Sequence, residues 1–203
     1  MLRTLLSVLI AVTFAGTLQA APCADVNMTV TASQPNDPGF EGLTKYTISG
    51  SWDIGQQQGI SHISFLLLLE AACECVCDTG FLKFASPAGS STGDDGQGGS
   101  CTVHYDGTFA CTGDPTIPPD DAAIKFEVIS EEGCESSPSG SGTWCFYSPI
   151  PPGPANTYTD AVALKYGTQE CFGDLVGVLP DCSFCSTVAV DEETWSIIKH
   201  LFR

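Results

Sequence analysis

The sequence is poor in positive charge. Lysine and arginine together number 7, against 24 aspartate and glutamate residues, and the 203-residue chain carries a formal net charge of −17. A chain this acidic is repelled by phosphate backbones and by anionic lipid surfaces. We therefore expect no nucleic-acid partner and no binding to an anionic membrane.

Long apolar runs and nucleotide-binding motifs are also scarce. After residue 20, the longest apolar run lies between Ile60 and Leu69, and its length of about ten residues is half of the roughly 20 that a membrane-spanning helix needs. Phosphate-binding loops and dinucleotide fingerprints are absent. The string Gly140-Ser141-Gly142 lacks the G-x-S-x-G spacing of a hydrolase nucleophile elbow. These absences argue against a membrane span, against nucleotide chemistry and against a hydrolase with a nucleophile elbow.

The first 20 residues have the pattern of a secretory signal peptide. Arg3 supplies the positive start, Leu5 to Gly16 the apolar core, and Leu18-Gln19-Ala20 a cleavage motif. Removal of this segment with Arg3 leaves 6 basic against 24 acidic residues, a net charge of −18. We expect residues 21–190 to form a single domain, because a chain of this size is long enough for one sizeable core.

Eleven cysteines follow the predicted cleavage point. In an exported chain this density predicts a disulfide framework. The odd count leaves one thiol unpaired, and Cys23, near the new N-terminus, is our candidate. Cys73, Cys75 and Cys77 alternate along an extended segment. Because residues two apart on a strand have poor disulfide geometry, we expect these three to pair with other segments. A thiolate metal cluster is the alternative.

Two further cysteine pairs are predicted from local turns. Cys101 faces Cys111 if Tyr105-Asp106-Gly107 forms a hairpin turn. Cys134 and Cys145 would close a second hairpin around a loop rich in serine, proline and glycine. Cys171, Cys182 and Cys185 are expected to be structural disulfide partners as well, because the Cys182–Cys185 spacing lacks the βαβ context of a redox site.

The segment from Ile60 to Cys77 is the centre of the predicted fold. Its first half alternates between polar and apolar residues, and its second half is apolar on both faces. This pattern predicts a strand that runs from a half-exposed end into the middle of the core. Several other segments also alternate as strands do: 26–32, 43–53, 80–85, 122–129, 142–148 and 158–166. The sequence thus predicts an all-β, antiparallel β-sandwich of about nine to eleven strands, braced by disulfides.

The segment 191–203 is expected to form a short amphipathic helix. Glu192 and Glu193 suit its N-terminal end, and Lys199 and Arg203 suit its C-terminal end. A helix of about 12 residues is marginal alone. It either packs on its own domain or serves as an export or sorting tail.

Candidate ligand and modification sites are few. Asp94 and Asp95, in a Gly/Ser/Asp-rich loop over 86–100, suit a calcium ion, although the EF-hand spacing is missing. A solvated loop is the alternative, and we expect no obligate cofactor. Asn27 begins an Asn-Met-Thr sequon for N-glycosylation. His62 and His104 form a catalytic or zinc site only if their strands are neighbours, and we predict no catalytic residue.

Three motifs together carry a resemblance. These are the signal peptide, the strand Ser61-His62-Ile63-Ser64-Phe65, and the tail from Thr194-Trp195 through Lys199 to Phe202-Arg203. Together they resemble uncharacterised secreted bacterial β-sandwich proteins with a short T-W-x-x-[IV]-K C-terminal tail. The resemblance covers a tenth of the chain. It implies export and surface attachment, and it brings no catalytic residues.

The sequence favours a secreted or cell-surface, non-enzymatic protein, structural or adhesive, whose loops at 86–100 and 131–142 meet a protein or glycan partner. A second hypothesis is a carbohydrate- or calcium-binding extracellular module, with Trp52, Trp144 and Tyr105 as its contacts. A third is a secreted hydrolase that uses His62 or a pair of carboxylates.

Overall fold

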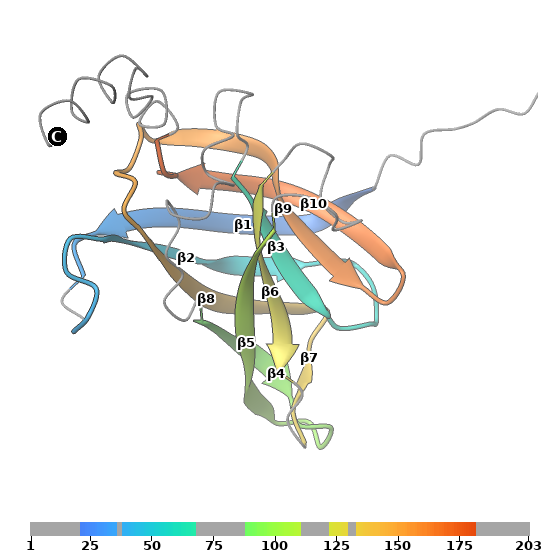
Figure 1. Cartoon of the computed structure of the whole chain (residues 1–203). Helices are drawn as coiled ribbons and strands as arrows, with labels where there is room; N and C mark the ends of the chain where they lie inside the picture. Colours follow the sequence, from blue (N-terminus) through green and yellow to red (C-terminus); the bar gives the residue numbers. More distant parts are fainter. Residues whose placement is uncertain (1–20, 36–37, 68–87, 111–121, 130–132, 182–203) are drawn as a thin grey trace, which may run out of the picture.

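The computed structural model describes residues 21–35, 38–67, 88–110, 122–129 and 133–181. These residues form ten strands and, within the described ranges, no helix (Figure 1). The strands are β1 (Ala21–Ser33), β2 (Thr44–Asp53), β3 (His62–Leu66), β4 (Ala88–Asp94), β5 (Ser100–Ala110), β6 (Ala123–Ile129), β7 (Glu135–Ser136), β8 (Ser139–Ser148), β9 (Asn156–Tyr166) and β10 (Gln169–Gly177). The all-β prediction is confirmed. The predicted signal peptide and C-terminal helix lie outside the described residues.

The strands belong to one sheet that closes on itself. Their order is β5-β6-β3-β9-β10-β1-β2-β8-β4, and β4 pairs again with β5, so nine strands form a barrel. The two-residue strand β7 continues the line of β8 along β4. The predicted β-sandwich is therefore wrong. Barrels and sandwiches share the same alternation of inward and outward residues, so the alternation alone cannot distinguish them.

The ring contains one parallel pair. Strand directions alternate around an antiparallel ring, so a ring with an odd number of strands needs at least one parallel pair. Here β1 and β10, the first and last strands, run parallel, and all other neighbours are antiparallel. The disulfide Cys23–Cys171, with a Cα–Cα distance of 4.9 Å, joins this pair of strands. It lies where the register of β1 shifts, between Pro22 and Asn27.

The barrel interior is packed with aromatic side chains. The ring of Trp144, on β8, lies 6.0 Å from that of Trp52, 5.5 Å from Phe65 and 5.7 Å from Tyr105, centroid to centroid. These partners come from β2, β3 and β5, so one indole joins four strands across the barrel. Each such buried side chain stabilises the fold by roughly 1.5–3 kcal/mol.

Strand β3 lies between β6 and β9 and is buried on both faces. Ile63 and Phe65 on one face, and Ser64 on the other, are all fully buried. Its central, buried place confirms the prediction for the start of the 60–77 segment. The half-exposed beginning is confined to the exposed Ser61, because His62 is already buried, at 7% relative exposure. Residues 68–87, with Cys73, Cys75 and Cys77, lie outside the described part.

The predicted hairpin between Cys101 and Cys111 is wrong, because residues 100–110 form the single strand β5. Tyr105, expected in the turn, is buried on the inner face beside Val103. The strand pairs with β4 at one end and β6 at the other. Cys101 instead bonds to Cys134, with a Cα–Cα distance of 5.9 Å. The predicted pairs Cys101–Cys111 and Cys134–Cys145 are therefore both wrong.

The disulfide Cys101–Cys134 passes over a glycine. Gly93 of β4 pairs with Cys101 on one side and with Ser136 on the other. A Cβ atom at Gly93 would lie 3.1 Å from Cys134 Sγ. The bond therefore links β5 to the start of β7 across the space that a side chain would fill.

Among the described residues, the unpaired cysteine is different from the one predicted. Cys23 is bonded to Cys171, so its assignment as the odd thiol is wrong. Cys145 is a free, partly exposed thiol rather than a disulfide partner. Cys111, Cys182 and Cys185 lie outside the described residues.

Candidate functional site

The outer face of the barrel carries a groove of about 460 Å³ over strands β2, β8, β4 and β5. Seven serines and threonines and two glycines line it, and the hydroxyl of one of them, Ser91, faces the barrel interior. They are Ser49 and Gly50 on β2, Ser141, Gly142 and Thr143 on β8, Ser90, Ser91 and Thr92 on β4, and Thr102 on β5. We call this feature the hydroxyl groove.

The hydroxyl groups form two rows across the strands. Ser49 pairs with Thr143, and Thr143 with Ser90. In the second row, Thr92 Oγ1 donates to Ser141 O at 3.4 Å and accepts from Ser141 N–H at 3.2 Å. Thr92 also pairs with Thr102. Because adjacent strands lie about 4.8 Å apart, the rows present closely and regularly spaced hydroxyl groups.

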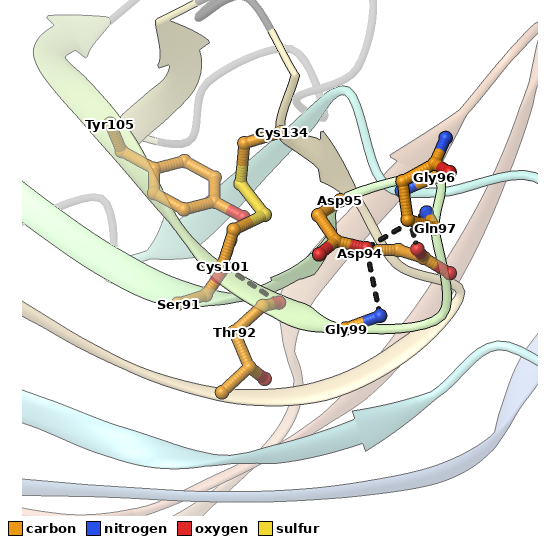
Figure 2. Close-up of a disulfide and its surroundings, with 10 residues drawn as sticks. All are labelled: Ser91, Thr92, Asp94, Asp95, Gly96, Gln97, Gly99, Cys101, Tyr105 and Cys134. Atoms are coloured by element: carbon orange, nitrogen blue, oxygen red, sulfur yellow. Dashed lines mark hydrogen bonds between the residues drawn. A yellow bond between two sulfur atoms is a disulfide. The ribbon is translucent and has the colours of Figure 1, made fainter.

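The floor of the groove is supported from inside the barrel by Trp144. A Cβ atom at Gly142 would lie 2.5 Å from Trp144 Cη2, and one at Gly89 would overlap the indole at Cδ1. The backbone can approach the ring only because these residues lack side chains. Ser91, also beneath the groove, shares a 2.9 Å hydrogen bond with the Tyr105 hydroxyl (Figure 2). Burial raises the pKa of Tyr105, so this partner remains a neutral phenol.

No lining residue of the groove has a side chain that ionises near neutral pH. Each hydroxyl can both donate and accept a hydrogen bond. The groove can therefore bind uncharged polar groups, but its own side chains offer no general acid, general base or metal ligand of the usual kind.

The two aspartates predicted as calcium ligands shape a turn between β4 and β5. Asp94 Oδ1 accepts a hydrogen bond from Gly96 N–H at 2.8 Å. Asp95 Oδ1 accepts from Gln97 N–H and Gly99 N–H, both at 2.8 Å (Figure 2). These bonds hold the pKa of Asp95 below its usual value. These bonds use Oδ1 of each carboxylate, and calcium binding at the turn stays a prediction. In the described ranges, no group of three or more His, Cys, Asp or Glu residues gathers as metal ligands.

The two histidines lie on strands that are not neighbours. His62 is on β3 and His104 on β5, and β6 lies between them. His62 is buried, whereas His104 is exposed on the outer face, paired with Ser90 beside the groove. The condition for a shared histidine site is therefore not met.

The aromatic residues suggested as glycan contacts are not at the surface. Trp52, Trp144 and Tyr105 are exposed by 3%, 0% and 2%. That assignment is wrong, because the three rings form the barrel core. Their alternation with polar neighbours places them inside, and the hydroxyl-bearing neighbours outside.

The glycosylation sequon lies on the outer face of β1. Asn27 is exposed, and its Nδ2 donates to Asp25 Oδ1 at 2.7 Å. Thr29, the third residue of the sequon, is also exposed, and its hydroxyl donates to Ser49 O at 3.1 Å. Both positions are accessible in the folded chain, and modification of Asn27 stays a prediction.

The segments predicted as contact loops, 86–100 and 131–142, contribute strands instead. Residues 88–94 form β4, and residues 139–142 begin β8. The two segments pair with each other through Ser91 and Gly142, and both line the groove. The prediction missed the strands because serine and glycine are typical of loops. The alternate hydroxyls of Ser139, Ser141 and Thr143 were the available signal.

The described part of the chain contains no helix with the length and apolarity needed to cross a bilayer. The two disulfides indicate folding in an oxidising environment. Comparison of the chain with models of protein families, with curated proteins and with solved structures finds no match.

Proposed function

We propose that this chain is an exported, non-enzymatic protein, structural or adhesive, that contacts its partner through the hydroxyl groove. The observation that carries the proposal is that β4 and β8, which come from the two segments predicted as contact loops, lie side by side and line one groove. Concave sites on rigid strands are the usual places of specific recognition.

Two further observations support a binding role over catalysis. The groove has no side chain suited to proton transfer or to nucleophilic attack with an adjacent base. In the described residues, the histidines lie on separate strands, and carboxylates such as Asp95 are engaged in turns. The disulfides agree with export into an oxidising compartment.

The test is attachment of the exported chain to the surface of the cells that produce it. Beads coated with the full, disulfide-intact chain should retain particles prepared from the surface of those cells. Thr143→Arg fills the groove with a long cationic side chain and should abolish retention. Thr31→Arg is the matched control, since Thr31 is also exposed on the outer face and the change in charge is the same. Equal retention by both variants would refute the proposed contact surface.

A further inference from the structure

We infer that the ligand of the hydroxyl groove is a neutral glycan. This inference rests on the proposed function and names the chemical class of the partner. Six of the hydroxyl side chains that line the groove lie on the outer face, all but that of Ser91, and each is both donor and acceptor. A ligand that matches such a lining must itself offer donors and acceptors in similar numbers, as sugar hydroxyl groups do.

The negative charge of the molecule argues against an anionic glycan as the ligand. The chain carries a net charge of −17, and no lysine or arginine lines the groove. Sulfated or carboxylated polysaccharides would therefore enter a negative field without a cation to offset it. A neutral saccharide avoids this cost.

The position of the groove argues against a peptide in extended form. Peptides that add to a sheet use free N–H and C=O groups at a strand edge. The groove lies on the outer face of four strands that are already paired, β2 to β8, β8 to β4 and β4 to β5. The groups exposed there are side-chain hydroxyls.

The hydroxyl groups are held loosely enough to exchange partners. The bond between Ser49 Oγ and Thr143 Oγ1 is 3.3 Å long, and that from Thr92 Oγ1 to Ser141 O is 3.4 Å. Both exceed the usual length of about 2.7–2.8 Å for hydrogen bonds between oxygens. A ligand can therefore replace these bonds at small cost, while the strands hold the oxygens in position.

The groove also offers small apolar contacts. The threonine methyl groups and the two glycines can face the C–H groups of a sugar ring. No aromatic ring lines the groove, so the stacking that strengthens many sugar sites is missing. We therefore expect weak binding to a single site, with Kd of the order of 1 mM, and avidity where many sites act together.

The test is an NMR titration of the full, disulfide-intact chain with neutral pentasaccharides: β-1,3-glucan, β-1,4-glucan, α-mannan and chitin. An oligogalacturonate of the same length is the anionic comparison. At least one neutral probe should give saturable shifts in amides 90–92 and 141–143, and the anionic probe should give none. If no neutral probe shifts these amides at about 10 mM, the inference is wrong.

Isosteric variants then locate the site. The pair Thr92→Val and Thr143→Val removes two hydroxyls without changing shape, and should weaken binding about 10-fold, as expected for two hydrogen bonds to neutral groups. Thr31→Val is the matched control, because Thr31 Oγ1 makes the same 3.4 Å bond to a strand carbonyl, and it should bind as wild type does. Binding unaffected by the double variant would overturn the inference.

The two proposals fail in different ways. If no glycan binds but Thr143→Arg still abolishes retention of surface particles, the ligand class is wrong and the contact surface is right. If both groove variants leave every form of binding unchanged, the contact surface itself is wrong.

Discussion

The absence of a Cβ atom at two glycines determines how closely the sheet approaches the core beneath the groove. Trp144 fills the barrel centre and contacts the inner side of Gly89 and Gly142, whose missing Cβ atoms leave room for the indole. The same glycines form part of β4 and β8, the strands that carry most of the hydroxyl groups. The shape of the outer surface therefore depends on a contact made inside the barrel.

We predict that Gly89→Ala destabilises the fold by about 1–3 kcal/mol, because its Cβ would overlap Trp144 Cδ1 and lie 2.6 Å from Nε1. Urea denaturation measures the change. Gly153→Ala is the control, since its Cβ would lie 3.5 Å from the nearest atoms, and it should change stability by less than about 0.5 kcal/mol. Equal stabilities for the two variants would show that the ring does not limit the approach of β4.

Asp95 should make the stability of the β4–β5 turn depend on pH. Its pKa is lowered in the folded chain by hydrogen bonds from Gln97 and Gly99 N–H. A carboxyl with a lowered folded pKa stabilises the fold above its unfolded pKa, and that stabilisation is lost as pH falls through the folded value.

The measurement is the melting temperature of wild type and Asp95→Asn between neutral and acidic pH. Asparagine keeps an acceptor oxygen but loses the charge. Wild type should be the more stable at neutral pH, and the difference should shrink as the carboxyl is protonated. A difference that grows toward acid would contradict the assignment.

At the scale of elements, the disulfide Cys101–Cys134 fastens β5 to the short strand β7 across Gly93. We predict that Cys101→Ala with Cys134→Ala lowers the free energy of unfolding by about 2–4 kcal/mol, since the bond closes a loop of 33 residues. Urea denaturation gives the loss. Peptide mapping without reductant should find the two cysteines in one cross-linked fragment, and a Cys101–Cys111 fragment would contradict the pairing.

The elements also show what could be predicted from the sequence. The alternation of Tyr46, Ile48 and Trp52 predicted β2 and its inward face, because burial of apolar side chains determines the register. The same rule predicted β6 and β9. Segments without apolar alternation were assigned to loops, and β4 and the start of β8 were missed.

Those missed strands exist for a tertiary reason. Ser90, Ser91 and Gly142 have weak intrinsic preference for strands. They are extended because β4 lies between β8 and β5, which pair with it on its two sides. The candidate site contains these residues, so it was the part of the molecule that was hardest to predict from the sequence. Disulfide partners were missed for a related reason, since Cys101 and Cys134 are brought together by the pairing of β4 with β5 on one side and with β7 on the other.

For the whole molecule, closure of the barrel depends on the seam between β1 and β10. This pair is parallel, and its register is interrupted between Pro22 and Asn27. Parallel pairing is slightly less stable per residue than antiparallel pairing. An open seam would expose two long strand edges, which are prone to aggregation. Cys23–Cys171 bridges the seam at the interruption, and its two cysteines have a sequence separation of 148.

We therefore predict that Cys23→Ala with Cys171→Ala opens the barrel at this seam before other pairs separate. By the chain-entropy relation, a loop of this length contributes about 5 kcal/mol. Hydrogen exchange followed by mass spectrometry should show faster exchange in β10 and in the β1 residues that face it, whereas the amides that pair β2 with β8 should stay protected.

The control is the Cys101→Ala, Cys134→Ala variant. Its amides at the seam should exchange as slowly as in wild type, and the faster exchange should occur in β4 and β7. Uniform acceleration over all strands in the Cys23/Cys171 variant would mean that the disulfide stabilises the barrel globally and does not hold its closure point.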